Sequence, residues 1–167
     1  MNAPYPCLWF QGNARAAVDF YLTVFDTARI VETALSPEGL PGEPGSLLTI
    51  AFEIGGQRFL AINAGAEFAF SPAVSFVLEC ETQDEVDRLW DRLSEGGQPM
   101  SCGWVTDRFG VTWQVVPRML LRVFHEPDSP SKRRVVEAML TMEKLDIAAL
   151  EAARDSEPQD GEAMPRA

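Results

Sequence analysis

The residue with the clearest potential for chemistry is Gln114, in a strand that follows a glycine-containing turn at residues 107–110. Alternation along this strand places Gln114 on the same side as Thr112 and Val116. An amide oxygen can bind a divalent cation, but a tightly held catalytic zinc or iron normally uses imidazole, thiolate or carboxylate ligands. The sole histidine, His125, lies beyond the strand, and a lone ligand there could not build a metal site. Gln114 is therefore a candidate for ligand binding and for a weak metal site.

Large aromatic side chains offer a second kind of chemistry, the stacking of a flat ligand in an apolar cup. The candidate ligand-binding residues are Trp9, Phe52, Asn63, Ser75, Trp104 and Gln114. A packed core is the ordinary role of such aromatics, and Phe10, Phe76 and Trp113 are open to the same two interpretations. Alternation does not assign Phe52, Ser75, Val77 or Gln114 to the inside or the outside of a sheet. Both interpretations stay open at this point.

Composition limits the class of protein. The chain has 167 residues, 46% of them apolar, and a net charge of −11. It is long enough for one ordinary domain or two small repeated modules. The negative charge opposes nucleic-acid binding, which needs a basic face. No apolar run reaches the roughly 18 residues that span a bilayer, and the first residues do not resemble an export signal. We expect a cytoplasmic protein without nucleic-acid or membrane partners.

The cysteines and several charged residues are expected to have structural and not chemical roles. Cys7, Cys80 and Cys102 have no paired spacing and are expected to be buried, reduced thiols. Asp107 and Arg108 are expected to be solvated turn residues. The basic cluster at 132–134 is expected to meet the acidic surface of a partner subunit.

The two halves of the chain repeat one pattern of elements. The first half has a strand at 7–11, an amphipathic helix capped by Asn13, and strands at 29–34, 47–54 and 58–64. The second half has a strand at 74–80, a helix opened by a capping box from Thr82 to Glu85, and strands near 100–106 and 111–117. The caps Asn13 and Thr82 and the core pairs Phe20-Tyr21 and Leu89-Trp90 have the same separation. We predict an α+β fold in which residues 4–120 form two paired βαβββ modules, at about 4–65 and 72–118.

Two helices are predicted in the last part of the chain, beyond residue 126. Prolines break the chain near 127–130, an apolar stripe runs from Val135 to Leu140, and Asp146 can cap a last short helix. Neither helix has enough apolar surface to stand alone, so each must dock on the sheet or on a second subunit. We predict a C-terminal helical extension at 126–153 and a disordered acidic tail at 155–167.

Three motifs carry a resemblance to a known family. They are Leu8-Trp9-Phe10-Gln11-Gly12-Asn13, Phe52-Glu53-Ile54-Gly55-Gly56-Gln57 and Cys102-Gly103-Trp104-Val105-Thr106-Asp107-Arg108-Phe109-Gly110. In this order they resemble the PhnB-like branch of the vicinal oxygen chelate superfamily, which includes glyoxalases and bleomycin-resistance proteins. The branch is often labelled 3-demethylubiquinone methyltransferase-like. The resemblance extends from about Pro4 to Leu150 and implies the vicinal oxygen chelate fold, in which each module curls its sheet into a half-open cup.

The resemblance also implies where a metal would bind. In metal-dependent members, a divalent ion on the first and last strands of both modules chelates vicinal oxygens of a substrate. Those positions fall near Pro6 and Asn63 in the first module and near Ser75 and at Gln114 in the second, where a glutamate is common at the last position. No histidine occupies them, so the ligand set is neutral and weak. The resemblance therefore implies either no tightly bound cofactor or a divalent metal held atypically by Gln114.

The methyltransferase label has little support from the residues. S-adenosylmethionine usually sits at a parallel-sheet crossover beside a Gly-rich turn, and Gly12 alone before the first helix is not such a turn. The leading hypothesis is a homodimeric PhnB-like protein that binds a small, partly apolar molecule without a tightly bound catalytic metal. One alternative is a metal-dependent lyase, isomerase or dioxygenase, and another is an assembly scaffold whose cup is filled by side chains.

Overall fold

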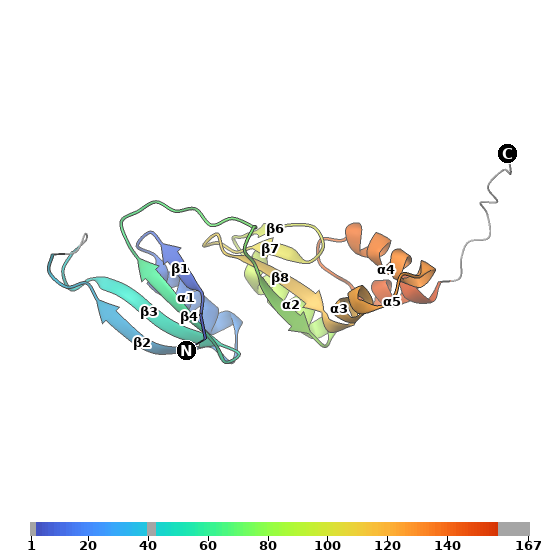
Figure 1. The fold of residues 1–167 in the computed structure, drawn as a ribbon, viewed down its shortest axis with the longest axis horizontal. Coiled ribbons are helices and arrows are strands. Elements are labelled where there is room, and N and C mark those ends of the chain that lie inside the picture. The colour runs from blue at the N-terminus through green and yellow to red at the C-terminus, as the bar shows by residue number, and fades with distance from the viewer. Residues whose placement is uncertain (1–2, 40–42, 157–167) are drawn as a thin grey trace. The chain divides into compact units, whose positions relative to one another are not determined.

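The computed structural model describes residues 3–39 and 43–156, and the chain divides into two compact units, Met1–Phe70 and Ser71–Ala167 (Figure 1). Each unit contains one mixed four-stranded sheet, with strand order β1-β4-β3-β2 in the first and β5-β8-β7-β6 in the second. Each sheet has a helix between its first two strands. The predicted α+β fold of two βαβββ modules is therefore confirmed.

The first unit packs one helix on its sheet. Its elements are β1 (Cys7–Phe10), α1 (Ala14–Val24), β2 (Arg29–Leu35), β3 (Leu47–Ile54) and β4 (Gln57–Asn63). The centre of its core is a stack of three rings, in which Phe52 lies between Tyr21 of α1, at 6.0 Å between centroids, and Phe59, at 5.2 Å. The turn between β3 and β4 is the predicted Gly-Gly hairpin, and both glycines have positive φ.

The start of α1 is capped by a distant residue. Asn13 occupies the N-cap position, but its side chain makes no capping hydrogen bond, so the predicted cap is wrong. Instead Asn63, at the end of β4, accepts a hydrogen bond from the Ala14 backbone N–H at 3.0 Å. A local sequence pattern cannot reveal a cap that comes from another element.

The second unit has the same order of elements but shorter strands on one side. Its elements are β5 (Phe76–Cys80), α2 (Gln83–Ser94), β6 (Gln98–Pro99), β7 (Trp104–Thr106) and β8 (Thr112–Pro117). Thr82 caps α2 by accepting from the Glu85 backbone N–H, as predicted. The Glu85 carboxylate reaches back to the Glu81 N–H at 2.7 Å, one residue before the N-cap.

A helical extension completes the second unit. It comprises α3 (Arg118–His125), α4 (Pro130–Leu140) and α5 (Ile147–Asp155), and we had not predicted α3 (Figure 1). Its apolar core joins side chains of the sheet and of all three helices: Val116, Leu120, Val123, Val135, Leu145 and Leu150. The predicted docking of the helices on the sheet is therefore realised within one chain. Residues 157–167 of the predicted tail lie outside the described part of the chain.

The basic cluster of α4 is engaged inside the extension. Lys132 Nζ donates to the last carbonyls of α3, those of Phe124 and Glu126, and Arg134 donates to carbonyls at the end of α5. Arg133 pairs with Asp128. These contacts explain the cluster without a partner subunit, since cations stabilise helix C-termini. In the described ranges, none of the helices is long and apolar enough to cross a bilayer.

Candidate functional site

Asp107 organises the turn that precedes Gln114. Its side chain is only 3% exposed. Oδ1 accepts from the backbone N–H groups of Phe109 at 2.8 Å and Val111 at 3.1 Å, while Oδ2 accepts from Trp113 Nε1 at 2.9 Å. The prediction of a solvated Asp107 is therefore wrong, because this carboxylate fixes both the turn and the indole of the next strand.

The orientation of Trp113 decides the orientation of Gln114. α2 packs against β8, and on the next strand Phe76, in register with Trp113, is half-buried while its neighbour Val77 is exposed, so Trp113 lies on the side that α2 covers. Successive side chains of a strand point to opposite faces, so Gln114 faces away from α2, together with Thr112 and Val116. The grouping of these three residues on one side matches the sequence prediction.

Three neighbouring strands place a row of side chains on this face. Val77 of β5 is in direct register with Gln114, and Gln114 is in direct register with Trp104 of β7. Side chains paired in this way lie on the same face of a sheet. Gln114 is thus flanked by an aliphatic and an aromatic side chain. We call Ser75, Val77, Trp104 and Gln114 the second-sheet row.

Ser75 joins the row through a hydrogen bond. Gln114 Nε2 donates to Ser75 Oγ at 2.8 Å, which leaves the Gln114 carbonyl oxygen as the acceptor of this amide. Ser75, Trp104 and Gln114 are half-buried, whereas Val77 is 49% exposed. Three of the six predicted ligand-binding residues therefore lie together beside an exposed aliphatic side chain.

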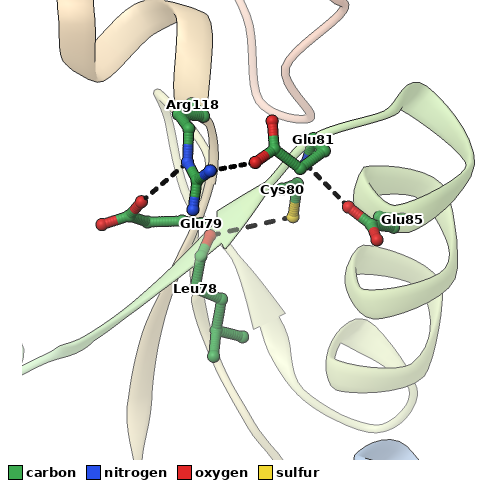
Figure 2. Close-up of polar contacts among 6 residues, drawn as sticks. All are labelled: Leu78, Glu79, Cys80, Glu81, Glu85 and Arg118. Atoms are coloured by element: carbon green, nitrogen blue, oxygen red, sulfur yellow. Dashed lines mark hydrogen bonds and ion pairs between the residues drawn. The ribbon is translucent and has the colours of Figure 1, made fainter. Parts of the chain in front are cut away.

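Two charged residues near the row were missed by the sequence reasoning. Glu79 lies two residues after Val77 on the same face, and Arg118 at the start of α3 donates to its carboxylate at 3.2 Å. Arg118 also pairs with Glu81, as Figure 2 shows. One guanidinium therefore meets two carboxylates beside the row. Alternation along β5 could have placed Glu79 with Val77, but the partner Arg118 lies in a helix that we did not predict.

The first unit does not bring its three candidates together. Phe52 is fully buried on the face of the sheet that packs on α1, so it is a core residue. Asn63 lies on that same face, where it also donates to the Leu47 carbonyl at 3.1 Å. Trp9 lies on the opposite face, and its indole donates to the Ala66 carbonyl at 2.8 Å and contacts Phe68. These contacts give Phe52 and Asn63 structural roles.

A pocket of about 230 Å³ lies at one end of the first sheet. Its lining residues are Gly12, Ser36, Ser46, Leu47, Leu48, Asn63, Ala64 and Gly65. Asn63 contributes to this lining, but both of its amide atoms already serve α1 and β3. Asn63 is the one residue of the predicted site among those that line this pocket.

The donors present do not fit a tightly held metal. In the described residues, no group of three or more His, Cys, Asp or Glu side chains could hold an ion. Asn63 is occupied by backbone groups and belongs to the other unit, so Gln114 has only the Ser75 hydroxyl as a close companion. A neutral amide and a hydroxyl are poor ligands for zinc or iron. We derive no chemical step through a metal.

The buried Cys80 thiol is not a candidate nucleophile. Burial, with a smaller contribution from Glu85, raises the pKa of the Cys80 thiol to about 11. The Cys80 thiol donates weakly to the Leu78 carbonyl at 3.7 Å (Figure 2). A thiol that keeps its proton at neutral pH is unreactive. Cys7 is exposed, so the prediction of buried thiols is wrong for that residue.

Comparison with known proteins assigns the chain to a family. A family model described as 3-demethylubiquinone-9 3-methyltransferase matches residues 2–116. The chain belongs to this family. The predicted PhnB-like resemblance is thereby confirmed, although the family match ends before the extension, for which we expected likeness to Leu150. None of the curated proteins compared with the chain matches it.

Solved structures of similar proteins match about 70% of the chain. A putative 3-demethylubiquinone-9 3-methyltransferase, PhnB protein, from Bacillus cereus is 30% identical, with a TM-score of 0.63 over 70% of this chain and 99% of that chain. Protein PA1353 from Pseudomonas aeruginosa is 24% identical, with a TM-score of 0.60 over 70% of this chain and 98% of that chain. The fosfomycin resistance protein FosX from Listeria monocytogenes, complexed with Mn(II) and sulfate ion, is 11% identical, with a TM-score of 0.47, covering 67% of this chain and 86% of that chain.

Proposed function

We propose that this family member binds a small, partly apolar molecule on the face of the second sheet that points away from α2. The observation that supports this proposal is the second-sheet row, in which the Gln114 amide lies between an indole and an exposed valine and is hydrogen-bonded to the Ser75 hydroxyl. Small-molecule sites typically combine apolar walls with a few placed polar groups. The homodimer and the cytoplasmic location remain predictions.

Each residue of the row has a distinct proposed role. Trp104 offers a flat face for stacking, and Val77 offers aliphatic contact. Ser75 accepts a hydrogen bond from the Gln114 NH₂ group, so it orients this amide and leaves its carbonyl oxygen to accept from a ligand. Such a site would favour a flat ligand with one hydrogen-bond donor.

The proposal does not include methyl transfer, although the family is named after a methyltransferase. The sheets are small and mixed, with one parallel strand pair in each, β1 with β4 and β5 with β8. S-adenosylmethionine sites use a doubly wound parallel sheet and a Gly-rich turn. The described residues do not fit that cofactor, and the proposal contains no step that uses it.

Titration with N-phenyl-1-naphthylamine tests the proposal. This neutral, flat dye has one N–H donor, and its fluorescence increases in an apolar site. We expect saturable binding to the wild type, weakened roughly three- to ten-fold in Trp104→Leu and in Gln114→Ala, since stacking and a single hydrogen bond contribute about 1 kcal/mol each. Gln57→Ala is the matched control, because Gln57 is exposed in the first unit and its side-chain amide donates to the carbonyl of its neighbour Arg58. Non-saturable binding, or equal affinity in all variants, would refute the proposal.

Metal titration separates the alternative function. The alternative is a metal-dependent lyase, isomerase or dioxygenase that uses Gln114. Calorimetric titration with Mn²⁺ and Zn²⁺ should give no stoichiometric binding to the wild type. One metal ion per chain, lost in Gln114→Ala but kept in Gln57→Ala, would favour the enzyme.

A further inference from the structure

We infer that the connection between α4 and α5, residues 141–146, holds the turn before β7 in place and so positions Trp104. This inference rests on the proposed function, because it assigns a positioning segment to the proposed site. We call residues 141–146 the clasp.

The strands on the side of the second sheet that carries Trp104 are shorter than their counterparts in the first sheet. In the first unit, β2 has seven residues and β3 has eight. Their counterparts β6 and β7 have two and three residues. Trp104 is the first residue of β7, so the backbone just before it has no partner from β6.

The clasp supplies that partner. The backbone N–H groups of Cys102 and Gly103 donate to the carbonyls of Met142 and Glu143, both at 2.7 Å. On its other side, the Gly103 carbonyl accepts from the Val115 N–H at 2.7 Å, beside Gln114. The turn that leads into Trp104 is thus hydrogen-bonded to the clasp on one side and to β8 on the other, so its backbone groups are satisfied by both.

Close packing makes this contact specific. Gly103 has a φ of +79°, and a Cβ atom at this position would lie 2.6 Å from the Val115 carbonyl oxygen and 2.9 Å from Leu145 Cδ1. Leu145 is fully buried in the core of the extension. Cys102 also has a positive φ, 62°, which is unusual for a residue other than glycine. A side chain at position 103 would therefore not fit between β8 and the clasp.

The start of α2 tethers the clasp. Gln83 Nε2 donates to the Leu145 carbonyl at 3.1 Å, and Gln83 Oε1 accepts from the Ile147 N–H at 2.8 Å. Lys144 Nζ lies 3.0 Å from an Asp87 carboxylate oxygen. The clasp is therefore fixed on one side by α2 and on the other by the strand that carries Trp104.

The clasp is an addition to the part of the chain that the family shares. The family match ends at residue 116. The Bacillus cereus structure aligns over 99% of its own length but only 70% of this chain. The residues that hold Trp104 from this side thus lie outside the matched region, so the placement of Trp104 is expected to be particular to chains that carry such an extension.

Fluorine NMR of the full chain with 5-fluorotryptophan tests the inference. Trp104→Phe assigns the Trp104 resonance, and Trp9 in the first unit is an internal reference. Gln83→Ala should shift or broaden the Trp104 resonance and leave that of Trp9 unchanged. It should also weaken N-phenyl-1-naphthylamine binding about three- to ten-fold, because α2 loses its hydrogen bonds to the end of the clasp and to the first residue of α5.

Two leucine variants complete the test. Leu145→Ala removes a fully buried contact to Gly103, whereas Leu140→Ala removes a side chain that is 61% exposed. The first should reproduce the effect of Gln83→Ala, and the second should change neither resonance nor affinity. An unchanged Trp104 resonance in a folded Gln83→Ala variant would overturn the inference. If the wild type fails to bind the dye, the proposed function falls, whereas the fluorine shifts still decide whether the clasp positions Trp104.

Discussion

Replacement of Asp107 should destabilise the second unit more than most single substitutions. Asp107→Ala removes the acceptor of two backbone N–H groups and one indole N–H, in a site that is 3% exposed. A buried donor left without an acceptor costs about 1–3 kcal/mol. Some of these donors would reach water after local relaxation, so we expect a loss of about 3–5 kcal/mol in the free energy of unfolding.

Asp107→Asn separates the turn from the indole. The amide keeps one oxygen for Phe109 and Val111 but presents an NH₂ group to Trp113 Nε1–H, which is also a donor. We expect a loss of about 1.5–3 kcal/mol. In a Trp113→Phe background the donor conflict is absent, so the additional cost of Asp107→Asn should fall by about 1 kcal/mol or more.

Urea unfolding followed by far-UV circular dichroism measures these losses. Circular dichroism is suitable because the tryptophan substitution would alter a fluorescence signal. If the two units unfold in separate transitions, only that of the second unit should move. Arg108→Ala is the control, since this exposed neighbour in the same turn should cost no more than about 1 kcal/mol. A loss below about 1 kcal/mol in Asp107→Ala would show that the carboxylate is not the buried centre of the turn.

Two further predictions concern titratable groups. A hydrogen bond from Gln83, and a second from Lys144, lower the pKa of Asp87 from its ordinary 3.8. Because the pKa of Asp87 is lower in the folded than in the unfolded state, the ionised carboxylate stabilises the fold above pH 3.8. This stabilisation is lost as the pH falls below 3.8 and through the folded pKa. Asp87→Asn should therefore reduce the acid sensitivity of the urea midpoint, and an unaltered pH profile would contradict the pairing. Cys80 affects stability in the opposite direction of pH, because its pKa is raised from an ordinary 9.0 to about 11. Its contribution to the stability of the fold is complete below pH 9.0 and is lost as the pH rises through 11. At about pH 8 Ellman's reagent should label exposed Cys7 quickly and Cys80 only after unfolding, and equal rates would exclude the buried thiol.

The repeated fold was predictable because its signals are local. Hydrophobic periodicity marked α1 and α2, Thr82 and Glu85 marked a helix start, and the Gly55-Gly56 pair marked a hairpin. Each of these patterns spans a few residues of sequence. Helix α3 escaped prediction because it follows β8 directly, and its N-cap position is Pro117, whose side chain makes no capping hydrogen bond.

The candidate site was only partly predictable because its residues depend on distant partners. Alternation could not say whether Gln114 or its neighbours face α2, since that choice is fixed by Asp107 holding Trp113. Asn63 resembled a site residue in the sequence, yet its amide caps α1 from 49 positions away. Burial of Asp107 was missed for the same reason, because a turn aspartate is usually solvated unless buried donors surround it.

The internal repeat also bears on which module would carry the proposed site. Counted back from the last parallel pairs, Phe10 with Asn63 and Cys80 with Pro117, the counterpart of the Val77 and Gln114 pair is Cys7 and Leu60. Leu60 is in register with Ala51, as Gln114 is with Trp104. The first module thus has two aliphatic side chains where the second has an amide and an indole, so it lacks the hydrogen-bonding centre of the row. The extension docks on the module that has kept that centre, and this coincidence is expected if the extension serves the site and not only the stability of the fold.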